Sequence, residues 1–227
     1  MSDVKLISHT NSPVLMMASA GAICFGKTFD EIVTNQKKQE EILIDCYESG
    51  HWSVFEFSDW DFQVTGVSRV FENQANRSRH MSPMWESGRH DQEYEAVAIG
   101  DDLLTKVTKA NIENYEITVG LGTPAEDARY VLPQGVARKA RLKRSFRNLM
   151  ETSMNRLCTH TQAEYRDIMW KMKELVTEEV DPFLGELLQP KCQVQLFCNE
   201  KDCCGYKGAL TKEEVKKAIA EYKGDNQ

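Results

Sequence analysis

Alternating apolar and polar positions indicate the strands of this chain. In DWDFQVTGV (59–67), Trp60 and Phe62 fall on the same face, as expected for a strand with one buried side. VKLIS (4–8) begins like a short strand, and ARKARLKR (137–144) alternates basic residues with small or apolar ones. Three segments far apart in the sequence are therefore expected to be strands.

Apolar residues at helical spacing predict several helices. LLTKVTKANIENYEITVGLG (103–122) is typical of a helix that ends at its glycines, and Thr123-Pro124 begins a short one, PAEDARYVL. Thr28 and Glu31 form a capping box, which predicts a helix that runs to about Ser49 and stops at Gly50. Further helices are indicated by an apolar stripe at Phe146, Leu149, Met150 and Leu157, by a second stripe from Tyr165 to Val176, and by a cap of Thr211 and Glu214.

The segment from residue 68 to residue 90 changes period twice. From Ser68 onward the apolar residues follow helical spacing, which puts Gln74 and Arg77 on one helix face near the C-terminal end. Pro83 and Gly88 then predict an irregular loop through residue 90.

Size and composition favour one α+β domain over residues 1–227. The chain has 227 residues, of which 41% are apolar, and it contains neither internal repeats nor low-complexity linkers. A net charge of −7 argues against a general nucleic-acid coat. No run of apolar residues is long enough to span a membrane, and the N-terminal segment does not resemble a signal peptide. Seven cysteines, an odd number, are expected to be reduced thiols in a cytoplasm.

The richest candidate chemistry lies in QANRSRHMSPMWESGRH (74–90). Arginine binds phosphate well because its planar fork donates two parallel hydrogen bonds and keeps its charge. Arg77, Arg79 and Arg89 could fold over one anion, with Gln74 and the serines as neutral donors. On density alone, a solvated turn whose charges pair with nearby acids is an equal alternative.

Several separated motifs resemble those of the flavin-dependent thymidylate synthases (ThyX). The family signature is Arg-His-Arg, seven residues and then Ser, with Gln ahead and Arg two residues behind. Here it becomes Arg77-Ser78-Arg79, Ser87, Gln74 and Arg89. Similar segments in the family order are HWSVFE (51–56), EDARYVLP (126–133) and SFRNLMETSMNRLCTHTQAEYR (145–166), and the opening VKLISHT also fits, so the resemblance covers most of residues 1–180.

The resemblance implies an enzyme that methylates dUMP reductively to dTMP. FAD reduced by NADPH would deliver a hydride, and 5,10-methylenetetrahydrofolate would supply the carbon. No cysteine attacks the pyrimidine in this family, and the signature region of this chain contains none. The implied fold is an α+β domain with a central antiparallel sheet and flanking helices, assembled as a homotetramer with shared active sites.

Roles follow position by position from the resemblance. Nucleotide contacts are expected at Gln74, Arg77, Ser87 and Arg89, and at Arg129 and Arg156 of a neighbouring subunit. Arg156 would stabilise negative charge on the pyrimidine, and we expect Arg156, Ser87 and Arg77 to be the catalytic set. FAD contacts are expected at Ser53, Arg77, Ser78, Arg79 and Arg147, with the ring of His51 beside the flavin. A buried histidine bonded to a backbone carbonyl is the alternative for His51.

The chain departs from the family pattern mainly on the flavin side. Ser78 replaces the signature histidine, Trp85 replaces a glutamate while Glu86 follows one place later, Ser145 and Glu151 replace two asparagines that usually help to hold FAD, and Val54 replaces a proline. These changes leave two alternatives open. One is a C5-methylating or hydroxymethylating enzyme acting on UMP or dCMP. The other is a nucleotide-binding homologue without catalysis.

Two further constellations have simpler interpretations. Cys192, Cys198, Cys203 and Cys204 lack the usual zinc-ligand spacing, so we expect no metal site. A cysteine-rich regulatory protein that binds nucleic acid is the least favoured alternative. The basic run RKARLKR is typical of a solvated strand face or a weak nucleic-acid patch. It could also serve the flavin pyrophosphate, the folate tail or a tetramer interface.

Overall fold

The computed structural model describes residues 2–89, 93–97 and 100–225, with side chains as far as residue 219. Contacts divide the chain into two compact units, residues 1–148 and residues 149–227. Each unit is described by itself. That the whole chain folds as a single domain stays a prediction.

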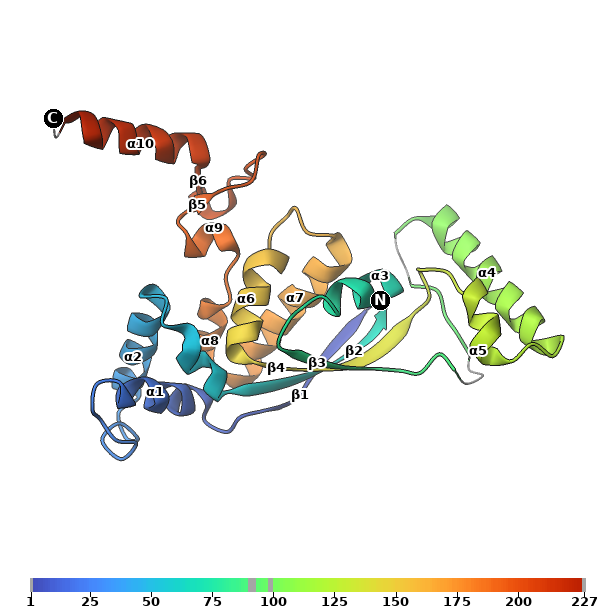
Figure 1. Ribbon diagram of the computed structural model, residues 1–227, viewed down its shortest axis with the longest axis horizontal. Helices are drawn as coiled ribbons and strands as arrows, with labels where there is room; N and C mark the ends of the chain where they lie inside the picture. Colours follow the sequence, from blue (N-terminus) through green and yellow to red (C-terminus); the bar gives the residue numbers. More distant parts are fainter. Residues whose placement is uncertain (1, 90–92, 98–99, 226–227) are drawn as a thin grey trace. The chain divides into compact units, whose positions relative to one another are not determined.

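The first unit is built on a four-stranded antiparallel sheet. Its strands are β1 (Asp3–His9), β2 (Asp59–Val67), β3 (Met81–Trp85) and β4 (Arg138–Ser145). They lie in the order β1-β2-β4-β3, so β3 forms one edge of the sheet (Figure 1). The predicted strands at 4–8, 59–67 and 137–144 are confirmed, and so are the α+β class and the antiparallel sheet.

Alternation places the aromatic residues of β2 in the core. Trp60 and Phe62 are fully buried and stack on one another with ring centroids 6.5 Å apart. The ring of Phe146 lies 5.6 Å from that of Trp60 and 6.1 Å from that of Phe55. Because successive residues of a strand face opposite sides, the polar residues of β2 point away from this cluster.

Strand β3 corrects the prediction of an irregular loop through residue 90. Residues 81 to 85 pair with β4, and Pro83 lies opposite Leu142. An inner strand forms ladder hydrogen bonds to neighbours on both sides, and a proline cannot donate one because it lacks an N–H. An edge strand has a neighbour on one side only, so it tolerates a proline. The sheet edge therefore accommodates the proline that indicated a loop.

The first unit also contains seven helical segments. They are α1 (Pro13–Ile23), α2 (Gln36–Glu48), η1 (Trp52–Phe57), α3 (Arg69–Ala75), α4 (Asp102–Gly120), α5 (Ala125–Ala128) and η2 (Arg129–Val131), as far as the described residues show. The predicted helix at 103–122 is confirmed by α4, which closes a small separate core around Tyr115 with Tyr94 and Ile112.

Helices α1 and α2 differ from expectation. Glu31 accepts the bonds of a capping box from Thr28, but the helix begins only at Gln36, where Asn35 provides the cap. Helix α1 was missed because its sequence, PVLMMASAGAI, is apolar on every side and has no helical period. The two helices pack closely, since a Cβ on Gly21 would lie 2.9 Å from Ile42.

The second unit is helical with one small parallel strand pair. Its elements are the later part of α6 (Phe146–Arg156), α7 (Ala163–Leu175), the π-helix η3 (Val176–Val180), α8 (Pro182–Leu187), α9 (Lys191–Val194), β5 (Phe197–Cys198), η4 (Tyr206–Gly208), β6 (Leu210–Thr211) and α10 (Lys212–Asp225). Helix α8 lies so close to η3 that a Cβ on Gly185 would come within 2.0 Å of Thr177. None of the helices described is long and apolar enough to cross a membrane.

Truncating the core of the first unit tests this arrangement. Phe62→Ala should lower the free energy of unfolding by about 3–5 kcal/mol, because it leaves a cavity among fully buried rings. Phe57→Ala is the matched control, since Phe57 is 63% exposed and should change stability by only about 0.5 kcal/mol. Urea unfolding followed by tryptophan fluorescence compares them, and equal losses would contradict the assigned face of β2.

Candidate functional site

The basic segment begins where helix α3 ends. Ser68 caps the start of α3 by accepting a hydrogen bond from the N–H of Phe71 at 3.1 Å. The helix ends at Ala75, so Arg77 lies beyond it in a turn, with its N–H 3.3 Å from the carbonyl of Gln74. The expectation that both residues lie on one helix face was therefore wrong, although both lie at the end of the helix.

A tight turn carries the chain from Arg77 into β3. His80 takes a left-handed backbone conformation with φ of 62°, which is uncommon for a residue other than glycine. The amide of buried Asn148 donates a hydrogen bond of 2.6 Å to the carbonyl of Arg79. This bond fixes the turn while the side chains of Arg77 and Arg79 remain exposed.

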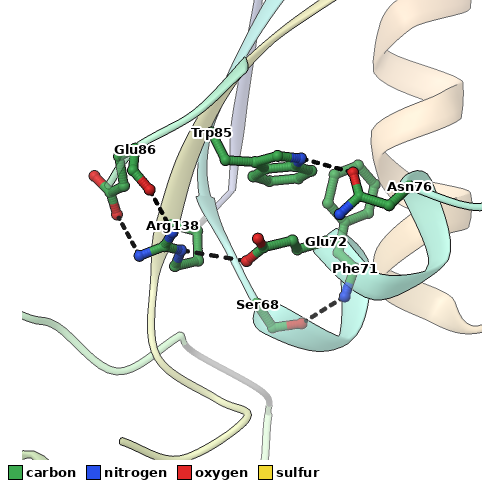
Figure 2. Close-up of polar contacts among 7 residues, drawn as sticks. All are labelled: Ser68, Phe71, Glu72, Asn76, Trp85, Glu86 and Arg138. Carbon is green, nitrogen blue, oxygen red and sulfur yellow. Dashed lines mark hydrogen bonds and ion pairs between the residues drawn. The ribbon is translucent and has the colours of Figure 1, made fainter. Parts of the chain in front are cut away.

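A buried arginine joins the two sides of the segment. Arg138 is 5% exposed on β4, and its Nε lies 3.3 Å from the carboxylate of Glu72 on α3. That contact is an ion pair whose N–H lacks hydrogen-bond geometry. Other guanidinium nitrogens lie 2.5 Å from the carbonyl and 3.7 Å from the carboxylate of Glu86 (Figure 2). One side chain thus ties α3 to the end of β3.

Trp85 faces the end of α3 in this frame. Its indole N–H donates a 2.8 Å hydrogen bond to Asn76, and its ring meets that of Phe71 edge-on at 6.1 Å (Figure 2). The residue that replaces the family's glutamate is therefore a brace between α3 and β3. Glu86, one place later, turns to Arg138 instead.

The loop after β3 brings further predicted nucleotide residues together. The N–H of Arg89 donates a 3.2 Å hydrogen bond to the hydroxyl of Ser87. A Cβ on Gly88 would lie 3.8 Å from Arg129 and 3.6 Å from the hydroxyl of Tyr94. Ser87, Arg89 and Arg129 are therefore neighbours within one chain. That Arg129 contacts a nucleotide of another subunit stays a prediction.

The signature arginines make no ion pairs within the described part of the chain. Arg77, Arg79 and Arg89 are exposed, whereas the described salt bridges involve other basic residues. A solvated turn that pairs with nearby acids would show such contacts, so the geometry favours a surface available to an external anion.

A cavity of about 390 Å³ gathers three of the predicted flavin residues. His51, Ser53 and Arg147 line it, together with apolar residues that include Trp52 and Phe25. Trp52 stacks on Tyr47 at 6.2 Å, and burial raises the pKa of Tyr47 to about 12. The alternative for His51, a buried histidine, is wrong because its side chain is exposed.

Asn148 connects this cavity wall to the signature turn. It directly follows Arg147 and holds the carbonyl of Arg79, while its N–H donates to the hydroxyl of Ser145 at 3.3 Å. The side-chain oxygen of Asn148 is buried without a hydrogen-bond partner among the described residues. Such an unsatisfied acceptor beside two arginines fits a ligand with donor groups.

The remaining predicted residues have separate surroundings. Ser78 is half-buried between Arg77 and Arg79. Arg156, in the second unit, places its guanidinium 4.4 Å from the centre of the Tyr165 ring, a cation–π contact. Roles for these residues, and for all the others assigned from the signature, stay predictions.

Comparisons with known proteins decide the family. A family model described as thymidylate synthase complementing protein (Thy1) matches residues 5–182. The chain belongs to this family. A flavin-dependent thymidylate synthase of Sulfurisphaera tokodaii is 32% identical over 203 residues, covering 84% of this chain and 79% of the relative. One of Pyrococcus furiosus is 29% identical over 221 residues, covering 88% of this chain and 90% of the relative.

Solved structures of the family share the fold. A crystal structure of ThyX from Helicobacter pylori with FAD and dUMP has a TM-score of 0.73 and 16% identity, covering 82% of this chain and 99% of the other. A second structure from that organism, also a complex with FAD and dUMP, has a TM-score of 0.71. The resemblance found in the sequence is confirmed, and the family is one of enzymes, as predicted.

Two supporting residues of the site were not found from the sequence. Arg138 was counted with a basic strand face, yet the alternation with Ala140 and Leu142 already places it on the buried side. Arg141 and Lys143, on the other face, pair with Asp61 and Asp59 of β2, as expected of a solvated face. Asn148 gave no sequence signal beyond its position after Arg147.

The Arg138 contact predicts a large loss of stability. Arg138→Met keeps the apolar stem but leaves the carboxylates of Glu72 and Glu86 without their cation, which should cost about 3–5 kcal/mol of unfolding free energy. Adding Glu72→Gln should recover part of this loss. Arg141→Met on the same strand removes an exposed ion pair and should cost far less. Urea unfolding at two salt concentrations measures the free energy of unfolding lost by each variant. Equal losses for Arg138→Met and Arg141→Met would refute the prediction.

The Trp85 brace predicts a measurable coupling energy. Trp85→Phe keeps a ring against Phe71 but loses the hydrogen bond to Asn76, which should cost about 1 kcal/mol. Asn76→Ala should cost a similar amount, and the double variant should lose little more than either single one. Additive losses in this double-mutant cycle would show that the bond does not form in solution.

Proposed function

We propose that the chain is a thymidylate synthase that methylates dUMP to dTMP, with FAD as cofactor, 5,10-methylenetetrahydrofolate as carbon donor and NADPH as reductant. Family membership supports the proposal, and so do the bound FAD and dUMP of the Helicobacter pylori relatives. The observation that carries it is the set of signature arginines, Arg77, Arg79 and Arg89, which are exposed and form no ion pair with any described acid.

The nucleotide phosphate would bind at the loop after β3. The N–H of Arg89 donates to the hydroxyl of Ser87, and the exposed guanidinium of Arg89 would meet the phosphate there together with Arg129 of a neighbouring subunit. Planar guanidinium forks suit phosphate oxygens, and two of them offset the charge of a monophosphate. Gln74 and Arg77, at the end of α3, would hold the rest of the nucleotide.

The flavin would bind along the cavity wall that joins η1 to α6. Ser53 and Arg147 line this cavity, and His51 presents its ring at the exposed rim. A volume of about 390 Å³ suits the ring system of the cofactor. Ser78, Arg79 and the side-chain oxygen of Asn148, which has no described partner, would meet its polar parts. FAD would supply the hydride that completes the methyl group.

The chain's own residues would position and polarise the pyrimidine. Arg77, Ser87 and Arg156 are the proposed catalytic set. The positive charge of Arg156 would stabilise negative charge on the ring carbonyl while the new C–C bond forms and the C5 proton leaves. Cation–π contact with Tyr165 holds that guanidinium in one orientation. No cysteine lies in the signature, so the proposal includes no thiol nucleophile.

The proposal includes a homotetramer in the cytoplasm. Arg129 and Arg156 of a neighbouring subunit would both reach the nucleotide. Assembly therefore would supply positive charge that one acidic chain, with a net charge of −7, provides only locally.

Substrate binding and conversion test the proposal with two reciprocal variants. The purified protein should be yellow, bleach with NADPH, and convert dUMP rather than UMP or dCMP. Arg89→Ala should raise the KM for dUMP about tenfold to a hundredfold and leave flavin content unchanged, because it removes a charge-assisted contact. Arg147→Ala should lower flavin affinity instead. Isothermal titration and product analysis by mass spectrometry measure both.

Three outcomes would contradict the proposal. Colourless protein that takes up no FAD but binds dUMP would make the chain a nucleotide-binding homologue. Conversion of UMP or dCMP in preference to dUMP would assign another pyrimidine substrate. Equal effects of Arg89→Ala and Arg147→Ala on both ligands would break the division between nucleotide and flavin residues. Arg141→Ala, at an exposed site outside both sets, is the control.

A further inference from the structure

The second unit contains a cluster of thiols that the proposed function does not use. A cavity of about 250 Å³ is lined by Cys158, Cys192, Cys198 and Cys204, which come from separate turns, helices and strands. No residue with a proposed role in nucleotide or flavin binding lines this cavity. All seven cysteines of the chain are free thiols.

One thiol of this cavity, Cys198, interacts with that of Cys203, which does not line the cavity. Cys198 lies buried in β5, where it pairs with Thr211 of β6, and its thiol hydrogen-bonds that of Cys203. The sulfur of Cys203 accepts a 3.4 Å hydrogen bond from the N–H of Gly205 and lies 3.8 Å from the carbonyl oxygen of Ala209. Both cysteines therefore adjoin residues 209 to 211, which lead into α10.

The arrangement favours thiol chemistry over metal binding. Among the described residues, no group of three or more His, Cys, Asp or Glu side chains is arranged to hold a metal ion. His160 lines the cavity, and its Nε2 is hydrogen-bonded to the carbonyl of Asp202 at 2.8 Å. Cys198 and Cys203 lie five residues apart on one short loop and their side chains interact, so a disulfide between them would close that loop.

We propose that Cys198 and Cys203 form a reversible disulfide that closes the loop from residue 198 to residue 203 and fastens the start of α10. The site is a modification site, and its oxidant is a low-molecular-weight disulfide such as oxidised glutathione.

The chemistry balances as two thiol–disulfide exchanges. The thiolate of half-buried Cys203 attacks one sulfur of oxidised glutathione, and the other glutathione leaves as a thiolate. Cys198 then loses its proton and attacks the sulfur of Cys203, which releases the second glutathione. Two protein thiols are oxidised, one external disulfide is reduced, and no adduct remains. Burial is the main cause that raises the pKa of Cys198, so Cys198 is the resolving thiol rather than the first attacker.

Cys204 is the competing thiol at this site. It is exposed, and hydrogen bonds from the hydroxyl of Thr159 and the N–H of Tyr206 lower its pKa. The thiolate of Cys204 therefore competes with that of Cys203 for the first attack on oxidised glutathione. Its neighbour Cys203 is a poor resolving partner, because a disulfide between adjacent residues is strained. A specific test has to separate a Cys198–Cys203 link from a lasting adduct on Cys204.

The sequence provides a direct assay. Trypsin cuts after Lys201, between the two cysteines, so their disulfide would join the peptides of residues 192–201 and 202–207. The full-length protein is incubated with graded ratios of oxidised to reduced glutathione, alkylated and digested. We expect the linked peptide pair, an intact mass lower by two hydrogen atoms, and full reversal by dithiothreitol.

Four serine variants assign the link. Cys198→Ser and Cys203→Ser should each abolish the joined peptides, while Cys192→Ser and Cys204→Ser, which change other thiols of the same two peptides, should leave them intact. The disulfide should also slow proteolysis of residues 204–219 on the order of tenfold, because it closes a short loop. Circular dichroism of the reduced variants checks that each one folds.

Other results would overturn the proposal. A link that persists in Cys198→Ser would assign a different pair, such as Cys192 with Cys204. A stable glutathione adduct on Cys204 with no joined peptides would show a lone reactive thiol. Stoichiometric zinc in the purified protein, with loss of oxidation until a chelator is added, would show that the cluster is a metal site.

Discussion

The ion pairs of Arg138 are the contact on which the candidate site depends. This guanidinium lies buried between Glu72 of α3 and Glu86 after β3. Glu72 lies just before Gln74 and Glu86 just before Ser87, so one side chain holds both ends of the segment that carries Arg77 and Arg79. Removing either partner would leave a charge in a place that water hardly reaches, which is much costlier than loss of an exposed pair. The segment is therefore fixed at its contacts with Arg138, while the side chains of Arg77, Arg79 and Arg89 are exposed to solvent.

The basic residues of the first unit differ in whether they have an acidic partner. Basic residues of β4 alternate between the buried and the exposed face, and on the exposed face Arg141 and Lys143 pair with aspartates of β2. Arg77, Arg79 and Arg89 differ because no described acid neutralises them, although acidic residues outnumber basic ones in the chain. An acidic protein that leaves a few particular cations uncompensated keeps its positive potential local to those side chains, which suits a small anion better than a long polyanion.

Sequence patterns predicted the elements whose side chains follow a single period. β2 and α4 are of this kind, and they were found within a residue or two. Helix α1 was missed because it is apolar all round, and β3 was missed because Pro83 signals a loop unless the strand lies at an edge. For the site, motif spacing named residues that do cluster, such as Ser87 with Arg89. The supports Arg138 and Asn148 were missed, since their partners lie 52 and 69 residues away along the chain.

The departures from the family pattern alter the support of the site more than its cations. In a strand a shift of one residue reverses the face of a side chain. The carboxylate moved from position 85 to position 86 therefore turns to Arg138, and Trp85 fills the other side against Phe71 and Asn76. Ser145 likewise holds the N–H of Asn148, whose amide fixes the carbonyl of Arg79. Residues at both places have structural partners within the chain, and these contacts hold the segments that carry the signature arginines.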